Sequence, residues 1–261
     1  MHSLHSPHSL QFTAESSSNG MHERDFTVGD VPGVLWSPAS GTDRAPLVLM
    51  GHGGGAHKKH PSMLGRAQRL VTGCGFHVAV IDAPGHGDRP RSAQDEQAVA
   101  ELRTAQAAGE PERPIVVPYN ARLAEIAVPE WQATLDALQE LPEIGADGPV
   151  GYAGIAMGTA IGVPLVAAEP RITAAVFGLM WPDALVEAAK RITVPVEFAM
   201  QWDDERIPRD ACLALFDAFA SKEKTLHANA GKHFDYPRFV EADSAARFLA
   251  RHLGEAVTSA A

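Results

Sequence analysis

The feature that most constrains the fold is the alternation of short apolar runs with longer stretches of helical periodicity. Continuous apolar runs, which are typical of strands covered on both faces, occupy residues 46–51, 76–82, 149–155, 172–180 and 194–202. The stretches between them have helical spacing, as in residues 61–75, where Pro61 provides a favourable first helical position. This alternation predicts one α/β domain with a mostly parallel, doubly wound sheet flanked by helices.

The ends and joints of this domain are marked by polar and turn-forming residues. Residues 1–20 are polar, rich in histidine and serine, and lack the apolar centre of a secretory signal, so we expect a flexible arm before a single domain at 21–261. Residues 26–38 suggest an early hairpin, with turn residues at Gly29–Asp30 and Pro32–Gly33. A long helix is expected at 121–141, kinked or broken at Pro129.

Composition excludes several classes of partner. The net charge of -10 provides no field to attract nucleic acid or anionic lipid, and the basic pair Lys58–Lys59 is too short to change that. No stretch is long and apolar enough to cross a membrane. Cys74 and Cys212 lie in apolar contexts, which indicates buried thiols in a reducing, cytoplasmic compartment. The oligomeric state stays open, a homodimer included.

Residues 151–160, GYAGIAMGTA, have the small residues of a sharp strand-to-helix turn. Gly154, Ala156 and Gly158 alternate as in the G-x-S-x-G nucleophile elbow, but the central residue is alanine. Alone, the pattern is equally compatible with ordinary strand-to-helix packing. Thr159 lies three residues into the expected helix and should point elsewhere.

A glycine-rich loop, GHGGGAHKKH at 51–60, follows one strand and precedes a helix. Its backbone N–H groups can turn toward one point and form an oxyanion hole together with the N–H that follows the nucleophile position. We assign these donors to Gly54 and Met157, with Gly53 and Gly55 as uncertain neighbours of Gly54. A phosphate loop would need the GK[ST] ending, which is missing. A zinc site at the three histidines of the loop, His52, His57 and His60, would lack a cysteine or carboxylate partner.

Two further stretches at expected strand ends supply an acid and a base. Asp204 in QWDDERIP lies where a loop leaves the sheet, with Asp203 as the alternative. His233 in AGKHFDYP follows the last expected strand and suits a general base. The order of nucleophile position, acid and histidine at the carboxyl ends of parallel strands favours one shared site.

These motifs together resemble the α/β-hydrolase superfamily over about residues 21–253. The resemblance is carried by GHGGG, DAPGHGD at 82–88, GIAMG at 154–158, DDERIP at 203–208 and KHF at 232–234. Within the superfamily the chain is similar to small esterases of the dienelactone-hydrolase type. The spacing of the strands implies no large cap domain, so a lid would come from residues 88–117 or from the arm.

Ala156 departs from the family pattern, because alanine has no oxygen to attack a carbonyl carbon. Three interpretations follow. The first, which the intact surroundings favour, is a serine-type ester hydrolase whose nucleophile has been deleted. The second is a non-hydrolytic enzyme, a cofactor-free oxygenase or lyase, that uses His233 and Asp204 for proton transfer. The third is a ligand-binding pseudoenzyme.

The substrate expected under the first interpretation is a small molecule. His52, Met180 and Trp181 are predicted to contact it, beside an apolar pocket for an acyl or aromatic group. An ester or lactone is the leading class, and a thioester or a carbon–carbon bond stays open. The sequence predicts neither a cofactor nor a metal.

Overall fold

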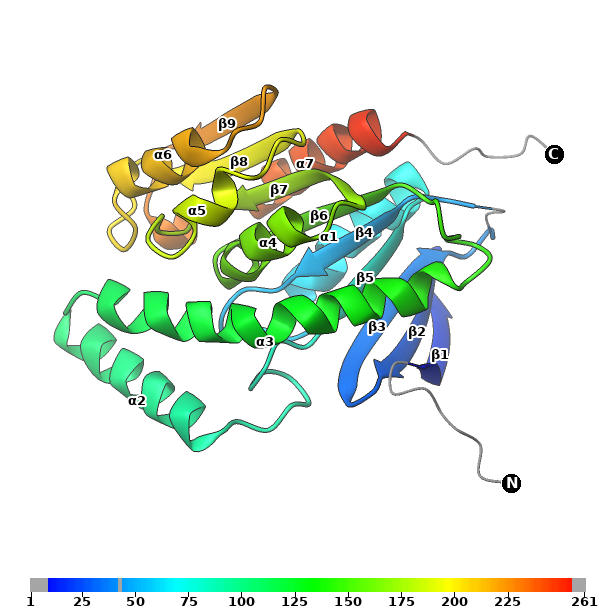
Figure 1. Ribbon diagram of the computed structural model, residues 1–261, viewed down its shortest axis with the longest axis horizontal. Helices are drawn as coiled ribbons and strands as arrows, with labels where there is room; N and C mark the ends of the chain where they lie inside the picture. The colour runs from blue at the N-terminus through cyan, green and yellow to red at the C-terminus, as the bar shows by residue number, and fades with distance from the viewer. Residues whose placement is uncertain (1–8, 42–43, 255–261) are drawn as a thin grey trace.

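The computed structural model of the chain describes residues 9–41 and 44–254 (Figure 1). The described residues form one nine-stranded sheet in the order β1-β2-β3-β5-β4-β6-β7-β8-β9. The strands are β1 Leu10–Ser18, β2 Met21–Val28, β3 Val31–Pro38, β4 Leu47–Gly51, β5 His77–Ile81, β6 Val150–Gly154, β7 Ile172–Gly178, β8 Val196–Gln201 and β9 Lys224–Asn229. The helices are α1 Pro61–Cys74, α2 Ala93–Ala108, α3 Arg113–Gln139, α4 Met157–Ala168, α5 Val186–Ala189, α6 Arg209–Ala218 and α7 Arg238–Leu253.

The sheet is parallel where it is covered on both faces. Strands β4 to β9 pair in parallel, and β1, β2, β3 and β5 are joined in antiparallel pairs. Every residue of β4, β5, β6 and β8 is buried, which explains why these strands are mainly apolar in the sequence. The predicted doubly wound α/β fold is confirmed.

Helices form a layer on each face of the sheet (Figure 1). One core lies under α1 and α7 and includes Trp36, Phe76 and Leu249. The other lies under α3, α4 and α6 and includes Trp131 and Phe177. The carboxyl ends of the parallel strands meet at one edge between these layers, which is where open α/β sheets place their ligands.

Three expectations about the boundaries of elements were wrong. Residues 10–18, assigned to the flexible arm at 1–20, form β1, which pairs with β2 through a turn at Asn19–Gly20 with φ values of 51° and 76°. Residues 1–8 of that arm lie outside the described residues. Pro32 and Gly33 belong to β3, so the hairpin turn is at Gly29–Asp30 alone. Helix α3 begins at Arg113, eight residues before the expected start, and continues through Pro129 without a break.

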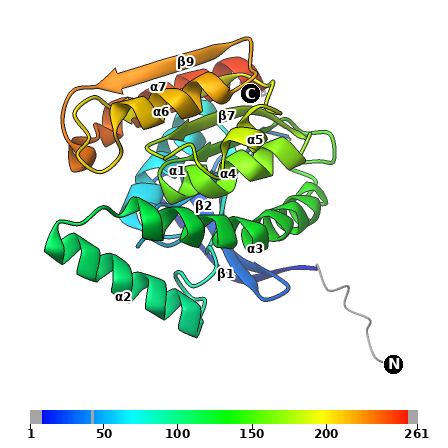
Figure 2. The ribbon, with the colours of Figure 1, turned by 60° about the vertical axis from the view of Figure 1, so that its left-hand side comes forward.

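Helices α2 and α3 form a hairpin whose corner projects from the body of the domain (Figure 2). Ser92 and Asp95 cap α2 reciprocally, and Gly109 ends the helix with a φ of 68°, which favours glycine. Arg122 of α3 forms an ion pair with the Asp95 carboxylate. The segment from which a lid was expected, residues 88–117, therefore builds this corner.

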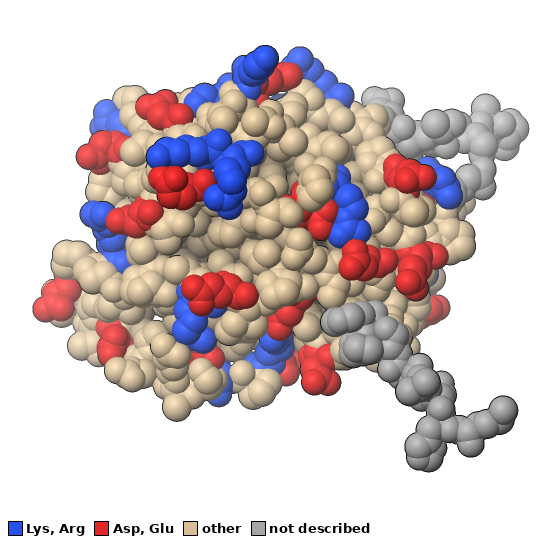
Figure 3. Space-filling view, viewed as in Figure 1, with Lys and Arg blue, Asp and Glu red and all other residues tan. Residues whose placement is uncertain are grey.

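On the face shown in Figure 3, acidic and basic side chains are intermixed, and neither charge dominates. The basic pair of the sequence is neutralised locally: Lys58 pairs with Asp82, and Lys59 with Glu23. Across the described ranges, no helix has both the length and the apolar character that a bilayer span requires.

Candidate active site

Ala156 lies on the sharp turn between β6 and α4. Its backbone has φ 57° and ψ −118°, a conformation that L-residues rarely adopt and that costs about 1–3 kcal/mol. The turn is held in place because the Ala156 N–H donates to the Gly178 carbonyl at 3.0 Å, and the Ala156 carbonyl accepts from Thr159 N–H at 2.8 Å. The strained conformation presents the side chain at position 156 away from the helix and toward solvent-accessible space.

The glycines around Ala156 are required by close backbone contacts. A Cβ atom on Gly158 would lie 2.5 Å from the Gly51 carbonyl oxygen, and one on Gly154 would lie 2.6 Å from the Gly158 carbonyl oxygen. Any side chain at either position would push α4 away from β4 and β6. The G-x-A-x-G spacing is therefore the steric condition for this elbow.

Thr159 is fully buried, and its side chain stabilises the turn. Its hydroxyl lies 2.8 Å from the Gly154 carbonyl and accepts a hydrogen bond of 2.8 Å from Gly178 N–H. As expected from the sequence, it points away from the position of a nucleophile.

His233 and Asp204 form the second part of the site. His233 Nδ1 lies 2.8 Å from Asp204 Oδ2, and Asp204 Oδ1 accepts from the backbone N–H groups of Arg206 and Ile207 at 2.8 and 2.9 Å. Burial alone would raise the pKa of Asp204, but the hydrogen bonds from His233 and these two N–H groups outweigh it and hold the pKa below its usual value. An ionised Asp204 fixes the His233 ring and leaves its Nε2 atom for proton transfer.

Two residues that the sequence analysis missed position the loop of His233. Glu205 Oε2 accepts from His233 N–H at 3.0 Å, and Gln201 Nε2 donates to the Lys232 carbonyl at 3.0 Å. Gln201 ends β8 directly before the acid motif, which is the one sequence signal that could have drawn attention to it.

Ala156 and His233 line the same cavity, which has a volume of about 220 Å³. Glycines 53–55 of the loop after β4 form another part of its wall. The remaining wall combines apolar and polar side chains: Ala56, Met63, Ile155, Leu179 and Phe234, and His60, Ser62, Tyr236, Arg66 and Arg238. The cavity therefore has the apolar surface expected from the sequence, and charged groups beside it.

Backbone donors are available near Ala156. The Met157 N–H is the first of α4, so it has no acceptor within the helix. A Cβ atom built on Gly54 would meet nothing within 4 Å, so this part of the loop faces open space along the cavity. Both N–H groups assigned to an oxyanion hole thus belong to segments that border the cavity.

Comparison with known proteins gives the family. No protein-family model matches the chain, and no curated protein sequence does so. Among solved structures, a PEG-bound complex of a cold-adapted esterase from an Arctic intertidal metagenomic library is 33% identical, with 93% of this chain and 99% of that chain covered and a TM-score of 0.73. The chain belongs to the esterases of the α/β-hydrolase fold. The native structure of the Arctic esterase matches at 30% identity and a TM-score of 0.69 over the same shares of both chains.

More distant esterases share the fold alone. The acetyl xylan esterase from Paenibacillus sp. R4 is 14% identical, with 94% of this chain and 88% of that chain covered and a TM-score of 0.65. The overall fold of this chain is thus shared with esterases of very different sequence.

His52, predicted to contact substrate, is buried and does not line the cavity beside Ala156. It is 2% exposed, its Nε2 accepts from Ala83 N–H at 3.0 Å, and its Nδ1 lies 3.0 Å from the Gly53 carbonyl. Burial lowers the pKa of His52 to about 4, so the ring is neutral near pH 7. His52 therefore shapes the glycine-rich loop from behind.

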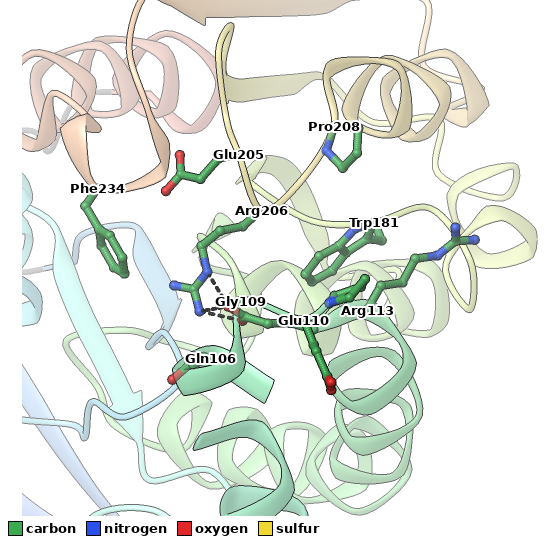
Figure 4. Close-up of a pocket in the computed structure, with 11 residues that line it drawn as sticks. Gln106, Gly109, Glu110, Arg113, Trp181, Glu205, Arg206, Pro208 and Phe234 are labelled. Atoms are coloured by element: carbon green, nitrogen blue, oxygen red, sulfur yellow. Dashed lines mark hydrogen bonds and ion pairs between the residues drawn. The ribbon is translucent and has the colours of Figure 1, made fainter. Parts of the chain in front are cut away.

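Met180 and Trp181 were also predicted to contact substrate, but neither lines the cavity beside Ala156. Met180 is 4% exposed and packs in the core under α3 and α4. Trp181 lines a second cavity, of about 720 Å³, together with Arg206 and Phe234 (Figure 4). Phe234 borders both cavities, so Trp181 lies near the site without reaching the elbow.

Arg206 spans this second cavity toward the corner of the helical hairpin (Figure 4). Its Nε donates to Glu112 Oε1 at 2.8 Å, at the start of α3. Because Asp204 accepts from the Arg206 N–H, this ion pair couples the hairpin to the loop that carries the acid.

Proposed function

We propose that this chain is a carboxylic ester hydrolase of the serine type whose nucleophile position is occupied by alanine, so that the chain as given does not turn over esters. The observation that carries the proposal is the backbone of Ala156, with its φ of 57° on an elbow beside His233 and the glycine-rich loop. The 30–33% identity to an esterase over almost its whole length supports the reaction class.

The strain at Ala156 favours deletion of a nucleophile over a site that never had one. A methyl group at this position contributes no chemistry, and glycine would adopt a φ of 57° without cost. The pair His233–Asp204 has a hydrogen bond of 2.8 Å and borders the same cavity as Ala156, as general-base catalysis by a serine hydrolase requires. These features support the deletion of a nucleophile at position 156.

The mechanism follows for a serine at position 156. His233 Nε2 would accept the hydroxyl proton while the serine oxygen attacks the ester carbonyl carbon, and Asp204 would stabilise the imidazolium. The N–H groups of Met157 and Gly54 would bind the developing oxyanion, each contributing roughly 3 kcal/mol. His233 would then protonate the leaving alcohol, and water activated by the same ring would release the acid.

The substrate that suits the cavity is a small ester or lactone, as in the dienelactone-hydrolase type. Neither guanidinium group of Arg66 and Arg238 makes a hydrogen bond or an ion pair with another described residue; Arg66 is half-buried, Arg238 is exposed, and both line the cavity. A negatively charged group on the acyl or alcohol part of the substrate would pair with them. We therefore propose an anionic or strongly polar small ester in preference to a long-chain lipid.

Two other functions use the same residues. The His233–Asp204 pair without a nucleophile suits proton abstraction in a cofactor-free oxygenase or lyase. A protein that only binds a ligand would need the cavity and no chemistry.

The deciding experiment compares the unmodified chain with Ala156→Ser on p-nitrophenyl acetate. The proposal expects kcat to rise by about 10⁶ over the unmodified chain, as comparable single deletions imply. The matched control is Ala156→Ser combined with His233→Gln, which should return the rate to the level of the unmodified chain. Failure of Ala156→Ser to gain activity, with its circular dichroism unchanged, would reject the hydrolase proposal.

A further inference from the structure

Three ionisable side chains meet away from the elbow, on strands β8 and β9 and on helix α7. Glu197 and Glu241 are buried and His227 is half-buried, and one potential ligand atom from each lies within 4.8 Å of the others. In the parallel ladder His227 is in register with Ala199, so Glu197 and His227 share the face of the sheet that α7 covers. Figure 1 shows β8 and β9 side by side at this end of the sheet.

The three side chains lie close enough to reach one small cation. His227 Nδ1 lies 3.1 Å from Glu241 Oε2, whereas the other ring nitrogen, Nε2, lies 3.8 Å from Glu197 Oε2, and one ion would take only one of these two nitrogens. Ligand atoms on a tetrahedral zinc ion with bonds of about 2.0–2.2 Å are separated by roughly 3.4 Å. One nitrogen of His227 and one oxygen of each glutamate lie within 4.8 Å of one another, so side-chain rotation would have to bring these three atoms closer to bind the ion.

A second, independent observation is the unpaired oxygen of Glu197. The residue is 4% exposed, and its Oε2 accepts from the Ser244 hydroxyl at 3.0 Å. Its Oε1 is buried and has no hydrogen-bond partner among the described residues. A buried carboxylate oxygen without a partner is costly, and either a bound cation or a proton would remove that cost.

We propose that Glu197, His227 and Glu241 form a binding site for one divalent transition-metal ion, with Zn²⁺ the best match. One imidazole nitrogen and two carboxylate oxygens are a donor set that zinc accepts, with water as the fourth ligand. The two glutamates supply two negative charges, which a divalent ion neutralises. Asn229 Nδ2 donates to Glu241 Oε1 at 2.7 Å and orients that ligand from outside the coordination sphere.

The bound ion would hold the two ends of the His233 loop together. His227 is near the end of β9, Glu241 is in the first turn of α7, and residues 230–237 run between them. Cross-linking β9 to α7 fixes the span from which His233 reaches Asp204. The site is therefore structural, and its occupancy is independent of what stands at position 156.

The test is titration of the EDTA-treated full chain with ZnCl₂ by isothermal calorimetry. One saturable site per chain is expected, with a rise in Tm on zinc addition. Glu197→Gln and His227→Gln should each weaken the affinity by at least about 100-fold, more than the 10–100-fold that loss of an outer-sphere partner costs.

Two controls distinguish this site from other histidines. His57→Gln, which removes an exposed histidine of the glycine-rich loop, should leave the affinity within about twofold. Replacement of the histidines at positions 2, 5 and 8 by alanine should do the same. X-ray absorption of the zinc-loaded unmodified chain should show one imidazole and oxygen ligands.

The proposal is overturned by absence of a stoichiometric site in the unmodified chain, or by an affinity that Glu197→Gln and His227→Gln leave unchanged. In the first case the buried oxygen of Glu197 carries a proton. In the second, zinc binds elsewhere, and an absorption spectrum with several imidazoles would identify the terminal histidines as its ligands.

Discussion

The buried, neutral His52 predicts a specific dependence of stability on pH. Its pKa is held at about 4 in the folded chain by burial, against an ordinary value of 6.5. Above pH 6.5 the ring is neutral in both states and has no effect. As the pH falls below 6.5, the unfolded chain takes up a proton that the folded chain refuses until near pH 4, so the free energy of unfolding decreases.

The size of the effect follows from these two values. Between pH 7 and pH 5, the difference in proton uptake at His52 removes about 2 kcal/mol from the free energy of unfolding. His77 and His86 also have pKa values lowered by burial, so they contribute in the same direction. Their contribution is common to the unmodified chain and to a variant at position 52, and it cancels in the comparison.

The measurement is urea unfolding followed by circular dichroism at pH 7, 6 and 5, for the unmodified chain and for His52→Gln. The variant starts from a lower stability at pH 7, because glutamine cannot keep both contacts of the ring, to Ala83 N–H and to the Gly53 carbonyl. Between pH 7 and pH 5, its free energy of unfolding should decrease by about 2 kcal/mol less than that of the unmodified chain. His57→Gln, in the same loop but exposed, should show the same decrease in free energy of unfolding with pH as the unmodified chain. Equal slopes for the unmodified chain and His52→Gln would refute the assignment of His52 as a buried neutral residue.

Three further outcomes are expected. Ala156→Gly should raise the free energy of unfolding by about 1 kcal/mol in urea titrations, since it removes strain at φ 57° at a smaller entropic cost; a loss of stability would contradict the strain argument. Lys58→Met should lower it by about 3 kcal/mol, because the fully buried Asp82 loses a partner at 2.7 Å, and a change below 1 kcal/mol would mean that water or another cation replaces the lysine. In the Ala156→Ser background, Arg66→Gln should raise KM about fivefold for a succinate monoester and leave KM for the acetate ester of the same alcohol unchanged, whereas equal effects on both would argue against anion recognition.

The central architecture could be predicted from the sequence because strands buried on both faces are recognisable by their high content of apolar residues. Strands β4 to β8 are mostly apolar, with Glu197 and Gln201 of β8 among the exceptions, and close contacts of about 2.5 Å require the glycines beside Ala156. The pair His233–Asp204 was predicted from the order of the motifs along the chain, and the structure brings its two atoms to 2.8 Å.

Other features depend on contacts that no local pattern records. Strand β1 has almost no buried side chain and is held by main-chain pairing, so its composition resembles a tail; the Asn19–Gly20 turn was its one local signal. His52 was assigned to substrate because its partner, the N–H of Ala83, lies 31 residues away. Glu205 contacts the backbone of His233, which side-chain motifs do not encode.

The central claim is that position 156 is the vacant place of a nucleophile. The most direct measurement is mass spectrometry of Ala156→Ser after treatment with a fluorophosphonate, which reacts covalently with activated serine hydroxyls. The account predicts one adduct per chain, located at position 156 and abolished when His233→Gln is added. A folded Ala156→Ser variant that remains unlabelled, or that carries its adduct at another residue, would contradict it.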